Sequence, residues 1–173
     1  MQELSIKNIK FENLTNGKLN YLQVIKQINK FLEEDPQKEY SLVIGSDSHE
    51  ENGTSLNNRK LKIVTAILVH RKGFGGKYFW IRKSVNNIHS LREKIYAETL
   101  MSLDIAREFV PVLKEFINGE YPKYDLEIHI DVGEFGETRD MIKEVVGMVT
   151  GYGFVAKTKP EAYGASYVAD KHT

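Results

Sequence analysis

The sequence predicts an α/β protein with a five-stranded mixed sheet, three antiparallel strands followed by two parallel ones. Helices are expected on both faces of the sheet, with an extra helix at the N-terminus. Three apolar, β-branched segments follow one another through short connections, which is typical of an antiparallel meander. Helical and strand patterns then alternate, and such alternation requires parallel pairing. Apolar residues at helical spacing precede the first strand.

In the first half of the chain, apolar residues recur at helical spacing until Asp35-Pro36, a dipeptide that ends a helix. Three strand-like segments follow, and the glycine-rich stretch Gly73-Phe-Gly-Gly76 separates the second from the third. The predicted elements here are a helix at residues 18–34 and strands at about 41–47, 61–70 and 77–82.

The second half opens with the longest helical pattern of the chain. Ser90 and Glu93 have the spacing of a capping box at its start, and Asn118-Gly119 closes it. The last predicted helix is rich in small residues, which allows close approach to a sheet. The predicted elements here are helices at about 87–118, 137–150 and 161–171 and strands at 124–131 and 154–157.

The composition is that of an ordinary globular domain. The chain has 173 residues, 41% hydrophobic and 28% charged, with a formal net charge of zero. We expect one domain over residues 1–173, in which 1–36 form an N-terminal extension with one helix. There is no cysteine, which excludes disulfides and thiolate chemistry. No membrane-spanning stretch or signal-peptide pattern is present, so a cytoplasmic protein with no membrane partner is expected.

Two aspartates end predicted strands and are followed by turn-forming residues. Asp47 closes the strand at 41–47, and Asp131 closes the strand at 124–131. Strand ends are where open α/β sheets bind ligands, and paired carboxylates favour cations. Taken singly, each aspartate also fits an ordinary strand terminator.

Two further acids lie on predicted helices. At about 100° per residue, Glu98 falls within the apolar stripe of the long helix, whereas Glu93 falls near the opposite side. A carboxylate on an apolar face is costly unless it is paired or binds a metal. Asp170 lies near the end of the last helix, where it opposes the helix dipole and favours a compensating cation, either Lys171 or a metal.

These acids, in this order of elements, make the chain resemble the ribonuclease H-like superfamily, and more closely its YkuK-like family. The resemblance covers about residues 11–173. The family's first-strand motif usually has Thr and Gln beside the aspartate, where this chain has Ser46 and His49. The matching segments are Ile44-Gly-Ser-Asp-Ser48, Val64-Thr-Ala-Ile67, His70-Arg71, Ser90-Leu-Arg92, Glu98-Thr99, His129-Ile-Asp-Val-Gly133, Thr138-Arg139, Lys159-Pro160 and Ala169-Asp-Lys-His-Thr173.

The resemblance implies a ribonuclease H-like fold and an acidic metal site. The implied ligands of Mg²⁺ or Mn²⁺, with two ions expected, are Asp47, Glu98, Asp131 and Asp170. Two such ions activate water and stabilise the leaving oxygen of a phosphodiester. His172 is a candidate general acid near the chain end or simply an exposed side chain. Arg139 and Lys159 are candidate ligands of a substrate phosphate, and Arg139 equally suits an ion pair with a neighbouring acid.

Three functions remain open from the sequence. The first is a metal-dependent nuclease or related phosphodiester hydrolase acting on nucleic acid, DNA or RNA. The second is an inactive nucleic-acid-binding module with the same fold. The third is an actin-like nucleotide-binding protein, which the short chain disfavours because that architecture needs two such domains. Cations gather on the three-strand meander, either as a nucleic-acid face or as an ordinary solvated surface; they are Arg59, Lys60, Lys62, Arg71, Lys72, Lys77, Arg82 and Lys83.

Overall fold

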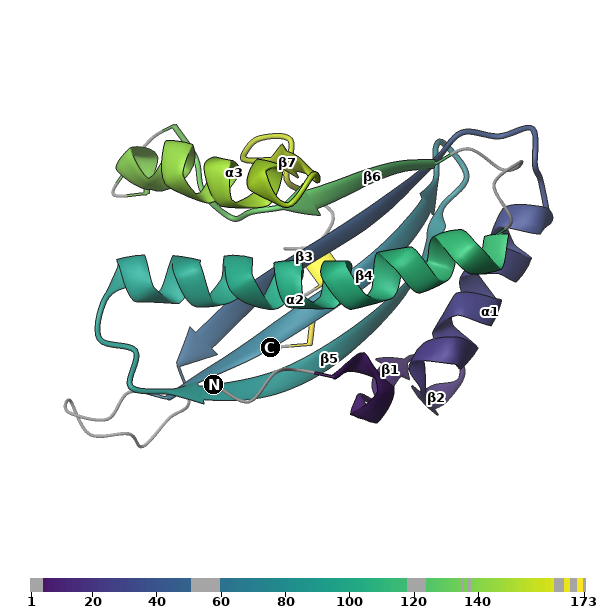
Figure 1. The fold of residues 1–173 in the computed structure, drawn as a ribbon, viewed down its shortest axis with the longest axis horizontal. Coiled ribbons are helices and arrows are strands. Elements are labelled where there is room, and N and C mark those ends of the chain that lie inside the picture. The colour runs from purple at the N-terminus through teal and green to yellow at the C-terminus, as the bar shows by residue number, and fades with distance from the viewer. Residues whose placement is uncertain are drawn as a thin grey trace.

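A computed structural model describes residues 5–50, 60–117, 124–134, 136, 138–163, 167–168 and 171–172. Its described part is a seven-stranded sheet with three α-helices (Figure 1). The strands lie in the order β2-β1-β5-β4-β3-β6-β7. The elements are η1 (Ile6–Asn8), β1 (Phe11–Asn13), β2 (Gly17–Leu19), α1 (Tyr21–Glu33), β3 (Tyr40–Glu50), β4 (Lys60–Arg71), β5 (Gly76–Asn86), α2 (Leu91–Ile117), β6 (Tyr124–His129), η2 (Arg139–Met141), α3 (Ile142–Gly151) and β7 (Val155–Lys157).

The five predicted strands are neighbours in the sheet, from β5 to the edge strand β7, and have the predicted directions. β3, β4 and β5 pair antiparallel, whereas β6 pairs parallel with β3 and with β7. The prediction of five strands is nevertheless wrong, because the short hairpin β1–β2 adds to the edge at β5. Each added strand has three residues, too few to show a period of two. Gly17 adopts a positive φ of 68° where this hairpin enters β2.

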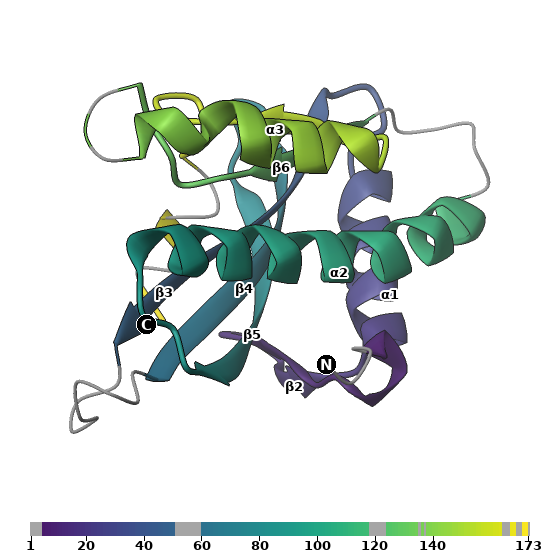
Figure 2. The same cartoon turned by 60° about the vertical axis from the view of Figure 1, so that its left-hand side comes forward.

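One face of the sheet carries the main hydrophobic core. On β3, Ser46 and Ser48 contact α2, so alternation turns the even-numbered residues of β3 toward the helices. Figures 1 and 2 show α2 running along this face. All three α-helices contribute to this single core, whose members include Ile25, Ile28, Ile44, Ile67, Ile105, Phe109, Val145 and Val149.

The other face carries a small cluster of Val64 and Trp80 with Tyr78 packed against it. His172, from the C-terminal segment (residues 161–173), lies here, since its ring stacks on Trp80. The helix predicted at 161–171 is present at Tyr167 and Val168, whereas 161–163 are not helical. The rest of that predicted helix lies outside the described residues. Long helices therefore cover one face in the described structure, rather than both as predicted.

Local signals explain where the helices begin. Asn20 and Gln23 form a capping box that starts α1 three residues later than predicted, because β2 takes residues 17–19. The predicted helix at 137–150 begins as the 3₁₀ turn η2 and becomes α-helical only at Ile142. No described helix combines the length and apolar character required to cross a membrane.

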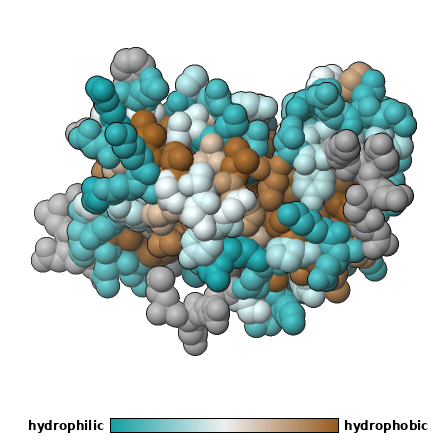
Figure 3. Space-filling model, turned by 45° about the horizontal axis from the view of Figure 1, so that its top comes forward, coloured by the Kyte–Doolittle hydropathy of each residue, from teal (hydrophilic) through white to brown (hydrophobic). Residues whose placement is uncertain are grey.

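On the face shown in Figure 3, hydrophobic atoms gather near the middle and hydrophilic atoms surround them.

Candidate active site

Asp47 lies inside β3 rather than at its end. The strand continues to Glu50, and Asp47 pairs with Val64 of β4 in the antiparallel register. Its neighbours Ser46 and Ser48 face α2, so the half-buried Asp47 side chain starts from the opposite face. It is thus positioned near the end of the central strand, on the face that also carries the C-terminal segment.

Glu98 is the buried acid of the site. It is 5% exposed on α2, and its Oε1 accepts a hydrogen bond of 2.7 Å from the Ser48 hydroxyl. Burial raises the pKa of Glu98 to about 7, although the Ser48 hydrogen bond and the Lys94 charge oppose this. The negative charges of Asp47 and Asp131 raise it further. Asp47 and Asp131, from two other parts of the sequence, are therefore close enough to Glu98 for their charges to act on it.

Glu93 has the separate role that helical geometry predicts. It is exposed, and its carboxylate accepts the Ser90 amide at 3.2 Å while the Ser90 hydroxyl accepts the Glu93 amide at 3.1 Å. This reciprocal pair is the predicted capping box. The assignment of Glu98 to the inward side and Glu93 to the cap is confirmed.

Asp131 lies two residues beyond β6, in the connection toward η2. Its Oδ1 is 2.6 Å from the Lys159 ammonium, although that buried atom has no aligned hydrogen bond. Charge attraction does not depend on alignment, so the ion pair stands. The backbone amide of Lys159 also donates to the Val132 carbonyl at 2.8 Å, which fixes the lysine beside this connection. A cation thus already lies against the predicted ligand Asp131.

The structure brings His172 to β5 rather than to the acids. Its ring stacks on Trp80 with centroids 3.7 Å apart, and its carbonyl accepts a hydrogen bond of 3.0 Å from Arg82. Desolvation and the positive charge of Arg82 lower the pKa of His172. Asp170, the fourth predicted ligand, lies outside the described residues.

Arg139 lies on η2 and lines a hollow of about 420 Å³ together with Glu134, Ile142 and Lys143. The connection from Asp131 leads directly to it, and Gly133 donates its amide to Thr138 Oγ1 at 3.3 Å within that connection. A phosphate entering this hollow meets the cations of Arg139 and Lys143 and also the carboxylate of Glu134. Lys143 was not predicted, because nothing in the sequence distinguishes it from other surface lysines.

Two further residues, one beside Glu98 and one near Asp47, were not among the predicted site residues. Lys94 lies 3.6 Å from Glu98 Oε1 and donates to the Ser48 carbonyl at 2.7 Å, so it joins α2 to β3. The spacing of four residues between Lys94 and Glu98 is the one available signal. His49 has a buried Nδ1 without a hydrogen-bond partner among the described residues, two positions along β3 from Asp47.

Among the described residues, no three His, Cys, Asp or Glu side chains are grouped closely enough to hold a metal ion. The donor chemistry nevertheless fits one. Carboxylate oxygens suit Mg²⁺ and Mn²⁺. Burial is the main cause of the raised Glu98 pKa, and the smaller contribution of the Asp47 and Asp131 charges is of the kind that a divalent ion relieves. The lysines beside Glu98 and Asp131 supply positive charge at the same positions.

Several cations of the meander are committed to ion pairs. Arg71 and Lys77 contact Glu34, and Arg82 contacts Glu12. The interpretation as an ordinary surface is favoured for these residues.

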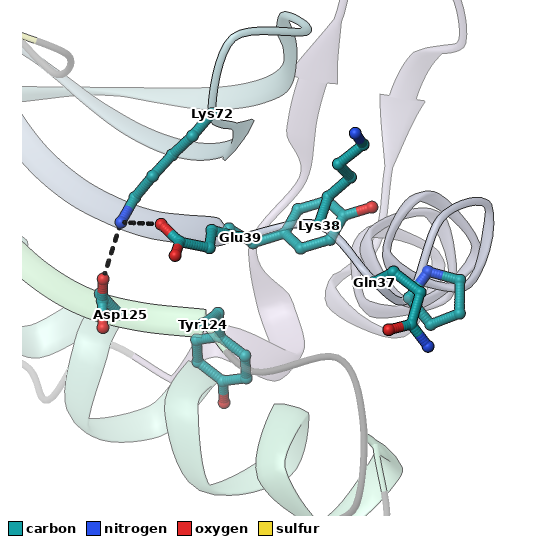
Figure 4. Close-up of a pocket in the computed structure, with 8 residues that line it drawn as sticks. Gln37, Lys38, Glu39, Lys72, Tyr124 and Asp125 are labelled. Carbon is teal, nitrogen blue, oxygen red and sulfur yellow. Dashed lines mark hydrogen bonds and ion pairs between the residues drawn. The ribbon is translucent and has the colours of Figure 1, made fainter.

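Lys72 completes this pattern at a cavity of about 450 Å³ at the opposite end of the sheet from Asp47, where Tyr40 pairs with Tyr124. Figure 4 shows its ammonium between Glu39 and Asp125, at 3.3 Å and 3.2 Å. Because both acids raise its pKa and hold its charge, this cavity is a poor phosphate site.

Acids on a central strand, on a following helix and in the connection after a parallel strand are the arrangement that the resemblance to ribonuclease H-like proteins implies. The family model described as ribonuclease H-like matches residues 23–173, and the chain belongs to that family. It is similar to a protein of Bacillus subtilis (strain 168) described as uncharacterized protein YkuK. The two are 33% identical over 172 residues, which cover 94% of this chain and 96% of that protein. No solved structure matches the chain.

Proposed function

We propose that this protein is a divalent-metal-dependent nuclease, or a related phosphodiester hydrolase, that acts on nucleic acid. The proposed metal ligands are Asp47, Glu98, Asp131 and Asp170, and the metal is Mg²⁺ or Mn²⁺, bound as two ions. The observation that carries the proposal is the burial of Glu98 on α2, where its carboxylate is bonded to Ser48, the residue next to Asp47. Burial is the main cause of its raised pKa, and the charges of Asp47 and Asp131 add to it. A buried carboxyl group costs stability, and perturbed carboxyl groups are typical of functional sites.

Bound metal would activate a water and stabilise the oxygen that leaves the phosphorus. The chain's own residues perform the remaining tasks. Ser48 orients the Glu98 carboxylate through its hydrogen bond, which keeps one oxygen turned toward β3. Arg139 and Lys143 bind a neighbouring phosphate of the substrate in the hollow beside the Asp131 connection. His172 serves as a general acid only if the C-terminal segment leaves Trp80, because stacking holds its ring over β5.

Cleavage assays test this proposal directly. We expect the protein to cleave at least one nucleic acid in the presence of Mn²⁺ or Mg²⁺. The substrates to test are single strands, duplexes, RNA–DNA hybrids and four-way junctions. EDTA should abolish the cleavage, and added Mn²⁺ should restore it. Gel analysis of labelled substrates over a protein titration provides the measurement. If the protein binds these nucleic acids but cleaves none of them, the result would contradict the nuclease proposal.

A binding module that lacks turnover is the second candidate, and one observation favours it. Lys94 and Lys159 already lie beside Glu98 and Asp131, so lysines compensate these carboxylates without a metal. Metal binding must then displace Lys159 from Asp131, whereas a module would retain the pair.

Thermal unfolding in Mn²⁺ distinguishes the two candidates. At a hundredfold excess over Kd, bound metal adds about 2.7 kcal/mol to the free energy of unfolding, or a Tm increase of roughly 5–10 °C for a chain of this size. Asp131→Asn should remove most of that increase. Lys159→Gln should enlarge it at low Mn²⁺, because the competing ammonium 2.6 Å from Asp131 is gone.

Asp125→Asn is the matched control for this measurement. Asp125 lies on β6, six residues before Asp131, and its exposed carboxylate pairs with Lys72 at the other end of the sheet. Its substitution should leave the Mn²⁺ response unchanged. If millimolar Mn²⁺ changes the Tm of neither the parent protein nor the Lys159→Gln variant, the result would argue against a resident metal site.

A further inference from the structure

A cavity of about 430 Å³ lies between the C-terminal segment and the face of the sheet opposite the α-helices. Leu68 and Tyr78 line it from β4 and β5, and Tyr163, Tyr167 and Lys171 line it from the C-terminal segment. We call it the tyrosine cavity. Its volume falls within the range of about 300–1,000 Å³ that small-molecule sites occupy.

The walls of the tyrosine cavity suit a flat aromatic ligand with a negative charge. Tyr163 and Tyr167 are 61% and 64% exposed, which leaves much of each ring open to a further contact. The Lys171 ammonium lies 4.1 Å from the centre of the Tyr167 ring, and His70 also lines the cavity. Among the described residues that line it, none is acidic.

The tyrosine cavity lies on the same face of the sheet as Asp47. Leu68 pairs with Val43, which precedes Asp47 by four residues, or about 13 Å at 3.3 Å per residue. Tyr163 also meets the ring of His129 edge-on at 5.8 Å, and His129 is two residues from Asp131. The cavity therefore lies about 13 Å along the sheet from Asp47 and borders, through Tyr163 and His129, the strand that leads to Asp131.

We propose that the tyrosine cavity binds one unpaired base of a single-stranded nucleic acid, stacked on Tyr167 or Tyr163, with a phosphate on Lys171. This rests on the proposed function, since it names the substrate of the same site. A base must leave its duplex partner to enter such a cavity, and stacking on aromatic side chains is the usual way that proteins hold unpaired bases. The substrate class is thus single-stranded nucleic acid, or a loop or end that presents an unpaired base.

The chain contains its own reporter for this binding. Trp80 is its single tryptophan, and its ring lies 5.6 Å from that of Tyr78 in the wall of the tyrosine cavity. The test titrates Asp47→Asn protein, which should not cleave, with a heptaadenylate strand, an abasic sugar–phosphate heptamer and a blunt duplex. We expect a saturable change in Trp80 fluorescence with the heptaadenylate, and weaker binding of the other two by about tenfold or more.

Variants assign the change to the cavity. Tyr167→Ala, combined with Tyr163→Ala, should weaken heptaadenylate binding about tenfold or more, whereas Tyr167→Phe should bind as the parent does, because it keeps the stacking ring. Tyr152→Ala is the matched control, since Tyr152 is 52% exposed but lies after α3, with Arg107 of α2 over its ring. It should have no effect.

Two outcomes would overturn the base site while the nuclease proposal stands. One is equal affinity for the heptaadenylate and the abasic strand. The other is a metal-dependent cleavage rate that is the same in the double tyrosine variant as in the parent. Heptaadenylate binding that needs Tyr167, in a parent protein that cleaves no nucleic acid, would instead support the tyrosine cavity and refute the nuclease. Preference for the blunt duplex would refute the unpaired base.

Discussion

Asp47→Asn is expected to reduce metal-dependent cleavage to background, by about 10³-fold or more, without loss of folding. Asparagine has the shape of aspartate but no charge, so a hard divalent ion loses a strong ligand on β3. Loss of several kcal/mol of charge stabilisation in the transition state corresponds to a thousandfold decrease, at 1.36 kcal/mol for each factor of ten. Single-turnover cleavage rates of parent and variant in saturating Mn²⁺ provide the measurement.

Folding must be followed in the same samples. Because Asp47 raises the pKa of the buried Glu98, removing its charge relieves repulsion, and the metal-free variant should be at least as stable as the parent. Asp35→Asn is a suitable control, since Asp35 lies in the turn between α1 and β3, at the other end of the sheet. Cleavage that survives in Asp47→Asn would point to a contaminant or to a different site.

Long, periodic elements were predictable from the sequence. The strands β3, β4, β5 and β6 and the three α-helices each have an apolar pattern long enough to show its period, and their order determines which strands pair in parallel. The positions of Glu93 and Glu98 followed from helical geometry alone, because five residues turn a side chain by about 140° around the helix. These predictions depend on local sequence and need no tertiary contact.

Contacts between distant segments were not predictable. The hairpin β1–β2 is held at the sheet edge by Phe11, which is fully buried and packs against Phe109 of α2. His172 was a candidate general acid because of its place after Asp170, yet its ring gains more by stacking on Trp80. The Lys159–Asp131 pair likewise depends on how the chain returns after β7. A single sequence contains no periodic signal for contacts between segments that are distant along the chain.

Glu98→Gln is expected to have opposite effects on function and on stability. Gln keeps the shape of Glu98 and can still accept the Ser48 hydrogen bond, but it removes a ligand charge. Metal affinity and any cleavage should fall at least about tenfold, since one such ligand is worth more than 1.4 kcal/mol. Isothermal titration with Mn²⁺ and the cleavage rate measure the two losses.

The stability effect of Glu98→Gln depends on pH, and its sign follows from the raised pKa. Folding raises the pKa of Glu98 from 4.5 to about 7, so between these values the folded protein holds more protons than the unfolded chain. The free energy of unfolding of the metal-free parent therefore falls as pH rises through that window, by at most about 3 kcal/mol. Gln does not titrate, so the variant should match the parent at pH 4.5 and exceed its stability at pH 8.

Denaturant unfolding at pH 4.5, 6 and 8 in EDTA, with Glu93→Gln as the matched control, tests this expectation. Glu93 is exposed at the start of α2, and a glutamine there can still accept the Ser90 amide, so the control should follow the parent at every pH. Loss of the partly exposed Lys94 contact offsets the gain at pH 8 by no more than about 1 kcal/mol. A parent whose stability is flat across this window would mean that Glu98 ionises as an ordinary surface acid. Loss of metal binding in Glu93→Gln, with normal binding in Glu98→Gln, would transfer the ligand role to Glu93.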